Sequence, residues 1–184
     1  MNDASAGASA NASVERGTAA GTTMKERGYL EYEVVGPHGE VKQTATSENA
    51  LTTVGAVYIL GLVKPSSPGT HDTSLFLGLI GSTPTFSVAD TMASHSGWTE
   101  ETATGYVRIA WLADTVTAGP PAALAKQSTF TENSDPMTVY GAFLVTDLSG
   151  AGGALIATSA LTGGGSLSVS SADTLNITFK LTLA

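Results

Sequence analysis

The clearest periodic pattern lies near the C-terminal end of the chain. From Asp173 to Leu183 the sequence reads DTLNITFKLTL, in which apolar and polar residues alternate without a break. Because successive side chains of a strand point to opposite faces, this pattern predicts a strand with one buried face. The residues of that face are Leu175, Ile177, Phe179, Leu181 and Leu183.

Two further elements are predicted in the first third of the chain. A partly alternating run over 29–45 is interrupted by Gly-Pro-His-Gly at 36–39, which favours a β-hairpin with its turn at these residues. The Ser-Glu-Asn segment at 47–49 then offers helix-capping side chains, and apolar residues follow at helical spacing. We therefore expect one short helix over about 49–62, before the Pro- and Gly-containing run at 65–69.

Short extended segments separated by turns fill the rest of the chain. Residues 74–80 form an apolar run that fits a strand buried on both faces, and 81–98 read as a long loop. Further strands are expected at 106–111, 126–131, 137–146, 154–160 and 166–170. No crossover helices separate them, which excludes a parallel α/β fold. The sequence therefore predicts an all-β fold, an antiparallel β-sandwich of jelly-roll-like type over 29–184, with strands across 74–183.

The first 28 residues differ in composition from the rest. Most of them are Ala, Gly, Ser, Thr or Asn, and the three basic and three acidic side chains of 1–28 cancel. Such a segment buries too little apolar surface to offset the entropy of ordering it. We expect residues 1–28 to form an extended, low-complexity N-terminal arm that becomes ordered against a neighbouring chain.

The composition and net charge of the chain limit the partners and the chemistry that we expect. Of the 184 residues, 42% are hydrophobic and only 13% are charged, and a low charge density suits a surface that is buried against other subunits. The chain has 8 Lys and Arg against 16 Asp and Glu, a net charge of −8, so nucleic acid is not an expected partner. The absence of Cys excludes disulfides, thiolate zinc sites and cysteine nucleophiles.

Neither a membrane span nor a secretory signal is expected. The longest apolar stretch, at 54–63, is about half of the roughly 20 residues that a bilayer requires. The N-terminal segment has neither a basic region nor an apolar region of the signal-peptide type. We therefore expect no membrane partner and synthesis in a cytoplasm.

One stretch gathers side chains that are typical of acid–base chemistry. Asp90 and His95 lie close together in the sequence, and Glu100 follows. A small hydrolase acting on a cell-envelope polymer would use these three residues. No G-x-S-x-G nucleophile elbow accompanies them, however.

A packing role explains the same stretch better. Asp90 or Thr91 is suited to capping a short turn, since such side chains accept hydrogen bonds from nearby backbone N–H groups. Met92 and Trp98 are then expected to pack on the sandwich. We favour this interpretation, and with it a protein that is not an enzyme.

The other titratable side chains give no indication of a catalytic or metal site. His38 lies in a turn and His71 in a Pro- and Gly-rich linker, each without a partner at metal-ligand spacing. Glu100 and Glu101 are adjacent and therefore diverge on a strand. Three aspartates occur at turns, where backbone hydrogen bonds explain them: Asp114, Asp135 and Asp147. We expect no catalytic residue, no metal and no cofactor.

The order of several segments resembles a family of tailed-bacteriophage virion proteins. The most distinctive is ADTMASHSGWTE at 89–100, which resembles a loop of that family. The others are ENALTTVGA at 48–56, LFLGLI at 75–80, GAFLV at 141–145 and DTLNIT at 173–178. The resemblance spans residues 29–184 and leaves the arm outside.

The resemblance implies a structural role without catalytic residues. Proteins of this family are similar to capsid decoration or cement proteins, which are β-sandwiches that bind the outer surface of a phage head and clamp neighbouring capsomers. The expected partners are the major capsid protein and further copies of the chain, as a homodimer or homotrimer. The expected location is the capsid surface of the virion, after synthesis in the host bacterial cytoplasm. The alternative is a tail or head-fibre component that binds a host surface.

Overall fold

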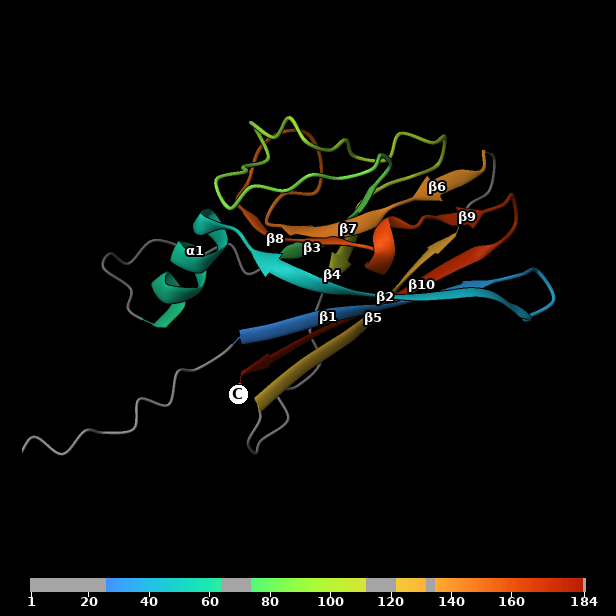
Figure 1. The fold of residues 1–184 in the computed structure, drawn as a ribbon, viewed down its shortest axis with the longest axis horizontal. Coiled ribbons are helices and arrows are strands. Elements are labelled where there is room, and N and C mark those ends of the chain that lie inside the picture. Colours follow the sequence, from blue (N-terminus) through green and yellow to red (C-terminus); the bar gives the residue numbers. More distant parts are fainter. Residues whose placement is uncertain (1–25, 64–73, 112–121, 132–134, 184) are drawn as a thin grey trace, which may run out of the picture.

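The computed structural model describes residues 26–63, 74–111, 122–131 and 135–183. In this part of the chain antiparallel strands dominate, with one α-helix and one short 3-10 helix (Figure 1). The elements are β1 (Glu26–Val35), β2 (Val41–Leu51), α1 (Thr53–Val63), β3 (Leu75–Ile80), β4 (Ile109–Trp111), β5 (Ala122–Thr131), β6 (Met137–Val139), β7 (Gly141–Val145), β8 (Leu155–Ala160), the 3-10 helix η1 (Thr162–Gly164), β9 (Leu167–Val169) and β10 (Thr174–Leu183). The predicted all-β antiparallel fold with one short helix is confirmed.

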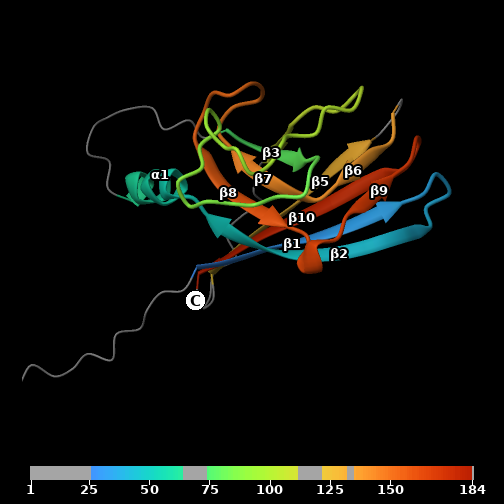
Figure 2. The same cartoon turned by 45° about the horizontal axis from the view of Figure 1, so that its top comes forward.

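Eight strands form one sheet in the order β4-β3-β7-β8-β2-β1-β10-β5, and β6 pairs with β9 in a separate ribbon. The large sheet has two four-stranded halves, which only a three-residue ladder joins, between Asn49–Leu51 of β2 and residues 157–159 of β8. The end strands β4 and β5 lie beside each other, so the sheet curls round and nearly closes (Figures 1 and 2). This strand order does not confirm the jelly-roll detail of the prediction.

A hydrophobic core fills the space between the two halves. From the half β2-β1-β10-β5, here called the open half, the buried apolar side chains include Leu30, Tyr32, Val34, Leu175, Ile177 and Phe179. Full burial of each such side chain contributes roughly 1.5–3 kcal/mol. The alternation predicted for 173–183 is confirmed as far as Phe179, and the side chains of Leu181 and Leu183 lie outside the described part.

The other half, β4-β3-β7-β8, here called the covered half, is buried on both faces. A second apolar cluster packs on its outer face, formed by Ile80, Met92, Trp98, Phe143, Val145 and Leu155. The loop 81–105 supplies Met92 and Trp98, as predicted, and Figure 2 shows this loop running over the sheet. Gly97 allows the loop to fold tightly, because a Cβ there would lie 1.9 Å from the carbonyl oxygen of Thr85.

The predicted start of the helix is wrong. Residues 49–51 belong to β2, because they pair with β8, and the helix begins at Thr53. Its cap is Thr52 rather than a residue of 47–49. The Oγ1 atom of Thr52 accepts a hydrogen bond from the N–H of Gly55 at 2.9 Å and donates one to the carbonyl of Leu155.

Other boundaries also differ from those predicted. β1 begins at Glu26, so 26–28 belong to the sheet rather than to the arm, and residues 1–25 lie outside the described part. The predicted strand 137–146 is divided at Tyr140, whose N–H binds the carbonyl of Ile80 at 2.8 Å. There the chain passes from the small ribbon to the large sheet. The predicted strand 106–111 is paired only over Ile109–Trp111.

Replacing Thr52 tests the importance of this cap. Thr52→Ala removes both side-chain hydrogen bonds and should lower the free energy of unfolding by about 1–2 kcal/mol. Thr52→Ser keeps the hydroxyl and should cost less than half as much. Urea unfolding of both variants measures this, and equal losses would contradict the assigned cap.

Candidate functional site

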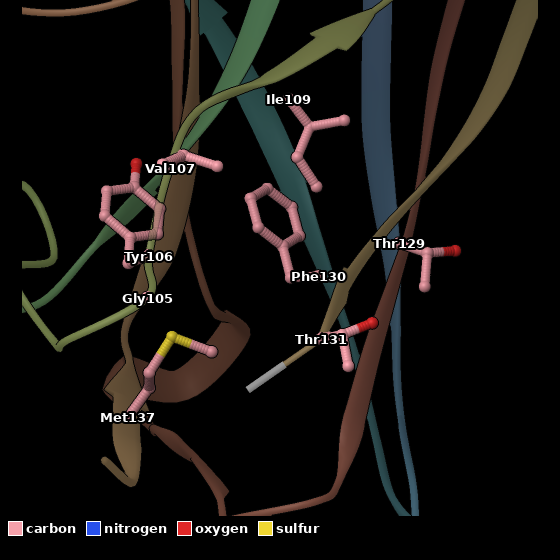
Figure 3. Close-up of a pocket in the computed structure, with 8 residues that line it drawn as sticks. All are labelled: Gly105, Tyr106, Val107, Ile109, Thr129, Phe130, Thr131 and Met137. Carbon is pink, nitrogen blue, oxygen red and sulfur yellow. The ribbon is translucent and has the colours of Figure 1, made fainter. Parts of the chain in front are cut away.

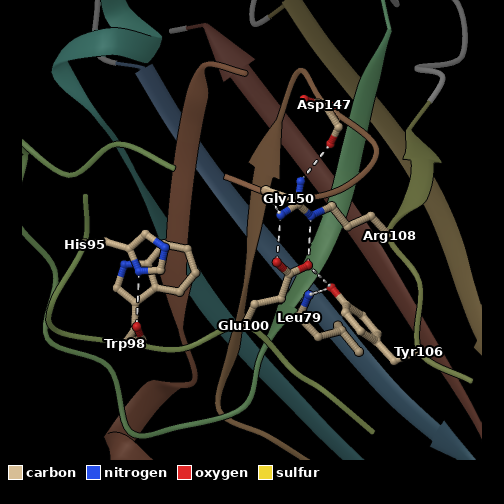
Figure 4. A network of polar contacts seen from close by, with 8 residues as sticks. All are labelled: Leu79, His95, Trp98, Glu100, Tyr106, Arg108, Asp147 and Gly150. Carbon is tan, nitrogen blue, oxygen red and sulfur yellow. Dashed lines mark hydrogen bonds and ion pairs between the residues drawn. The ribbon is translucent and has the colours of Figure 1, made fainter. Parts of the chain in front are cut away.

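A buried ion pair lies at the centre of the candidate site. The Nε atom of Arg108 donates to Glu100 Oε1 at 2.8 Å, and Nη2 donates to Oε2 at 2.7 Å (Figure 4). The side chain of Arg108 is 2% exposed and that of Glu100 is 25% exposed. Two parallel charge-assisted hydrogen bonds fix both groups in one geometry.

The remaining donors of Arg108 hold a turn on the other side. Nη1 donates to the carbonyl of Asp147 at 3.0 Å, and Nη2 donates to that of Gly150 at 2.7 Å. The guanidinium carbon also lies 5.3 Å from the ring centre of Phe143. Burial alone would lower the pKa of Arg108, but the hydrogen bonds and charge of Glu100 outweigh it and raise that pKa.

Tyr106 connects the ion pair to the sheet. Its hydroxyl donates to Glu100 Oε1 at 2.9 Å and accepts from the backbone N–H of Leu79, in β3, at 2.9 Å (Figure 4). Burial, together with the charge of Glu100, raises the pKa of Tyr106 far above its ordinary value. The phenol is therefore a fixed, neutral hydrogen-bonding group.

Two exposed apolar side chains lie next to the network of Arg108, Glu100 and Tyr106. Val107 is 66% exposed and Leu148 is 53% exposed. Together with Glu100, Tyr106 and Arg108 they line a hollow of about 420 Å³, here called the Val107–Leu148 hollow. The hollow therefore has a fixed polar base and an apolar rim.

Val107 does not lie where the sequence pattern places it. The alternation of 106–111 predicts that Val107 shares a buried face with Ile109 and Trp111. Trp111 is buried, but Val107 is exposed, because Arg108 takes the inward position and pairing within the sheet starts only at Ile109.

A second hollow lies on the other side of Val107. It measures about 210 Å³ and separates Gly105, Tyr106, Val107 and Ile109 from Thr129, Phe130, Thr131 and Met137 (Figure 3). We call it the β4–β5 hollow. The rings of Tyr106 and Phe130 are stacked across it, with centroids 6.3 Å apart.

Each of the three hydrolase candidates has structural partners, and Asp90 and His95 share Trp98. The ring of His95 stacks on that of Trp98 at 3.8 Å, and its Nδ1 lies 3.1 Å from the Trp98 carbonyl (Figure 4). Asp90 accepts from the N–H of Ser87 at 3.1 Å, which confirms its predicted role in a turn, and from the indole N–H of Trp98 at 3.4 Å. Glu100 belongs to the ion pair. No hydrogen bond or ion pair joins any two of these three side chains.

The other predicted residues lie elsewhere. His38 is exposed in its turn, and Glu101 accepts from the backbone N–H groups of residues 102 and 103. His71 and Asp114 lie outside the described residues. In the ranges that the structure describes, no three His, Asp or Glu side chains are grouped so as to hold a metal ion. None of the helices in those ranges has the length and apolar character that crossing a membrane requires.

Sequence reasoning missed Arg108, Tyr106 and Leu148 as site residues. One signal was present: Arg108 is the single charge in the apolar run YVRIAW. A charge in such a run needs a partner when the run is buried. The pattern does not say which of the chain's 16 acidic residues supplies it.

Comparison with known proteins gives no match: no family model fits the chain, and neither a curated protein nor a solved structure is similar to it. The resemblance to phage virion proteins therefore stays a prediction, and the contacts described above carry the functional argument.

Breaking the buried pair should have a far larger effect than breaking an exposed one. Glu100→Ala leaves Arg108 buried without its countercharge and should lower the free energy of unfolding by about 3–5 kcal/mol. The control Glu31→Ala removes the exposed pair with Lys180 and should cost below about 1 kcal/mol. Denaturant unfolding distinguishes the two, and similar losses would show that the Glu100–Arg108 pair is not a structural anchor.

Alkaline pH should destabilise the protein through its buried phenols. Burial raises the pKa of Tyr32 from 10.0 to about 12, and that of Tyr106 is raised as well. Between pH 10 and 12 the unfolded chain releases protons that the folded chain retains, so the free energy of unfolding falls as the pH rises. Each retained proton contributes a slope of about 1.4 kcal/mol per pH unit.

The substitution Tyr106→Phe tests how much of this pH dependence of the free energy of unfolding comes from Tyr106. Tyr106→Phe should make the loss of stability between pH 10 and 12 shallower by up to that amount, whatever it costs at neutral pH. An unchanged slope in Tyr106→Phe would contradict the raised pKa.

Proposed function

We propose that this chain is a structural virion protein that binds the outer surface of a phage capsid and stabilises it by holding neighbouring capsomers together. The proposal takes the class of protein from the sequence resemblance and the binding surface from the structure. It names the major capsid protein and further copies of the chain as partners, and it requires no catalytic residue.

The observation that carries the proposal is the exposed apolar rim on a fixed base. Val107 and Leu148 are both more than half exposed, while the groups beneath them are held by the Arg108–Glu100 pair. Burying such a side chain in a complex contributes up to roughly 1.5–3 kcal/mol, and a fixed base avoids the cost of ordering the site during binding. A modest contact of this kind, repeated on a lattice, gives strong attachment through multivalency.

The residues that carry the resemblance also support a structural role. Within 89–100, Met92 and Trp98 are buried against the covered half, and Asp90 holds the turn that precedes them. His95 stacks on Trp98, and Glu100 anchors Arg108. Every one of these side chains shapes the loop that borders the Val107–Leu148 hollow, so a role in scaffolding accounts for this segment without a reaction.

Copy number and surface substitutions test the proposal together. Heads and tails are separated from virions of the phage that encodes the chain, and the protein is quantified in each. A lattice offers on the order of hundreds of equivalent sites, whereas a tail offers a few to a few tens. We expect hundreds of copies with the heads, and a handful with the tails would contradict capsid decoration in favour of a receptor-binding role.

The surface is tested by adding protein back to heads that lack it. Val107→Asp and Leu148→Asp should each weaken binding to heads by at least tenfold, because a charge replaces the apolar contact. Val57→Asp is the matched control, since Val57 is 65% exposed on α1 and lies away from this hollow. Equal binding by all three variants would show that the Val107–Leu148 hollow is not the contact surface.

A further inference from the structure

Helix α1 has one side buried on β8 and one side exposed. Gly55 lies on the buried side, because a Cβ at this position would lie 2.0 Å from the carbonyl oxygen of Ile156, in β8. The same carbonyl accepts the backbone N–H of Thr52 at 3.1 Å, and the Thr52 side chain caps the first turn. The helix is therefore held in one orientation on the sheet.

The side of α1 opposite Gly55 has no cover. Successive residues of an α-helix are about 100° apart around its axis, so Thr53 and Val57, each two residues from Gly55, point away from β8. Both are exposed, and Val57 is 65% exposed. The helix is uncharged and almost wholly apolar along Thr53–Val63. Helices that are apolar all round are normally buried all round, so this face is of the kind that another surface covers.

A second exposed valine extends this face. The carbonyl of Val88, in the loop 81–105, accepts the backbone N–H of Thr53 at 2.8 Å, which places Val88 beside the first turn of the helix. Val88 is 68% exposed, and the next residue, Ala89, is exposed as well. We call Thr53, Val57, Val88 and Ala89 the α1 patch. Exposed apolar residues that are gathered in this way, unlike a single one, indicate an interaction surface.

The α1 patch carries no charge, although the chain as a whole is acidic. Neither of the two segments that contribute to it, 50–63 and 81–89, contains a charged residue. The full chain has a net charge of −8. Like charges repel two copies that approach each other, and this repulsion is weakest where both copies present an uncharged surface. The charge distribution therefore favours this patch as the place where two copies meet.

The chemistry of the patch also fits a second copy of the chain. Interfaces between identical subunits are more apolar than those between separate proteins, and a two-fold dimer uses the same patch on both copies. An uncharged apolar patch is complementary to itself. The base of the Val107–Leu148 hollow, in contrast, holds the Arg108–Glu100 pair, whose polar groups a different surface must match.

The shape and position of α1 allow such a contact. The side chains of Thr53 and Val57 are short, so two helices can approach to the usual interaxial distance of about 8–10 Å. In Figures 1 and 2 α1 lies at one end of the described chain, and the ribbon of β6 and β9 lies toward the other end. A contact through α1 therefore leaves that ribbon uncovered.

We propose that two copies of this chain form a dimer through the α1 patch, with α1 of one copy packed on α1 of the other about a two-fold axis. The inference rests on the proposed function for naming further copies as partners, but it adds the surface, and its test uses the free protein without capsids. The two-fold axis repeats each contact, so Val57 and Val88 of both copies leave water together. On a head, the dimer joins two capsid-bound copies by a contact that the capsid protein does not make.

Charged substitutions in the patch give the first test. Val57→Asp places a carboxylate of each copy beside the two-fold axis, so it should weaken self-association of the full-length protein at least about tenfold in sedimentation equilibrium. Val88→Asp should weaken it as well. Val41→Asp is the matched control, because Val41 is 54% exposed on β2, and it should change association less than about threefold.

The substituted valines are all exposed, so each variant should stay folded, which circular dichroism verifies. An unsubstituted protein that stays monomeric would overturn the proposal. So would association that is as strong in Val57→Asp as in Val41→Asp.

Cross-linking gives the second test, because the chain has no cysteine of its own. A two-fold axis brings Val57 of one copy close to Val57 of the other, so Val57→Cys protein treated with a short bismaleimide should give covalent dimers. Val41→Cys protein, treated in the same way, should give none. Mixed copies that cross-link Val57→Cys to Val41→Cys, without dimers of Val57→Cys alone, would show a head-to-tail contact and overturn the proposal.

The two proposals fail separately. Copies that form the α1 dimer but do not bind heads would contradict capsid decoration and leave the dimer intact. Heads that bind a protein which stays monomeric in solution would contradict the dimer and leave decoration intact. At concentrations at which the free protein is monomeric, Val57→Asp should still bind heads, because Val57 does not line the Val107–Leu148 hollow.

Discussion

The bidentate pair between Arg108 and Glu100 is the interaction on which the surface of this protein depends. Taking two charges out of water costs several kcal/mol per ion, and their attraction offsets this only where the remaining donors and acceptors are satisfied. Here the carbonyls of Asp147 and Gly150 and the hydroxyl of Tyr106 meet that condition. These partners come from separate segments, so the pair forms fully only when the loop, the turn and the sheet are all in place. The shape of both hollows follows from that requirement.

The outer faces of the two halves of the sheet differ in their exposure to solvent. The covered half hides its outer face beneath the loop 81–105, whereas the open half presents polar cross-strand contacts such as that between Glu31 and Lys180, at 2.8 Å. The ammonium of Lys180 also lies 5.1 Å from the ring centre of Tyr29. Such exposed pairs contribute little, but they make a sheet face that is stable in water without a cover. The exposed apolar side chains Val107 and Leu148 lie instead beside the end of the covering loop, where they line one hollow with Glu100.

The parts of the fold that local periodicity determines could be predicted from the sequence. The alternation of 173–183 indicated β10, because a two-residue period reports which face is buried. The continuous apolar run at 74–80 indicated a strand buried on both faces. The start of the helix could not be predicted in the same way. Residues 49–51 look like a capped helix start in isolation, but they pair with β8, more than a hundred residues later in the chain. Long-range pairing overrides local propensity there, and the cap moves to Thr52.

The candidate site is harder to predict from the local sequence than the fold is. Burial of the run YVRIAW requires a partner for Arg108, and two adjacent carboxylates, Glu100 and Glu101, precede it by eight and seven residues. Glu101 instead accepts the backbone N–H groups of residues 102 and 103, and its neighbour turns toward the guanidinium. The path of the loop over Trp98 decides between them, and that path depends on the sheet beneath it. A binding surface of this kind resides in the relative positions of distant segments rather than in a motif. Spacing along the chain therefore indicates Glu100 as a candidate acid–base side chain but gives no indication of its contact with Arg108.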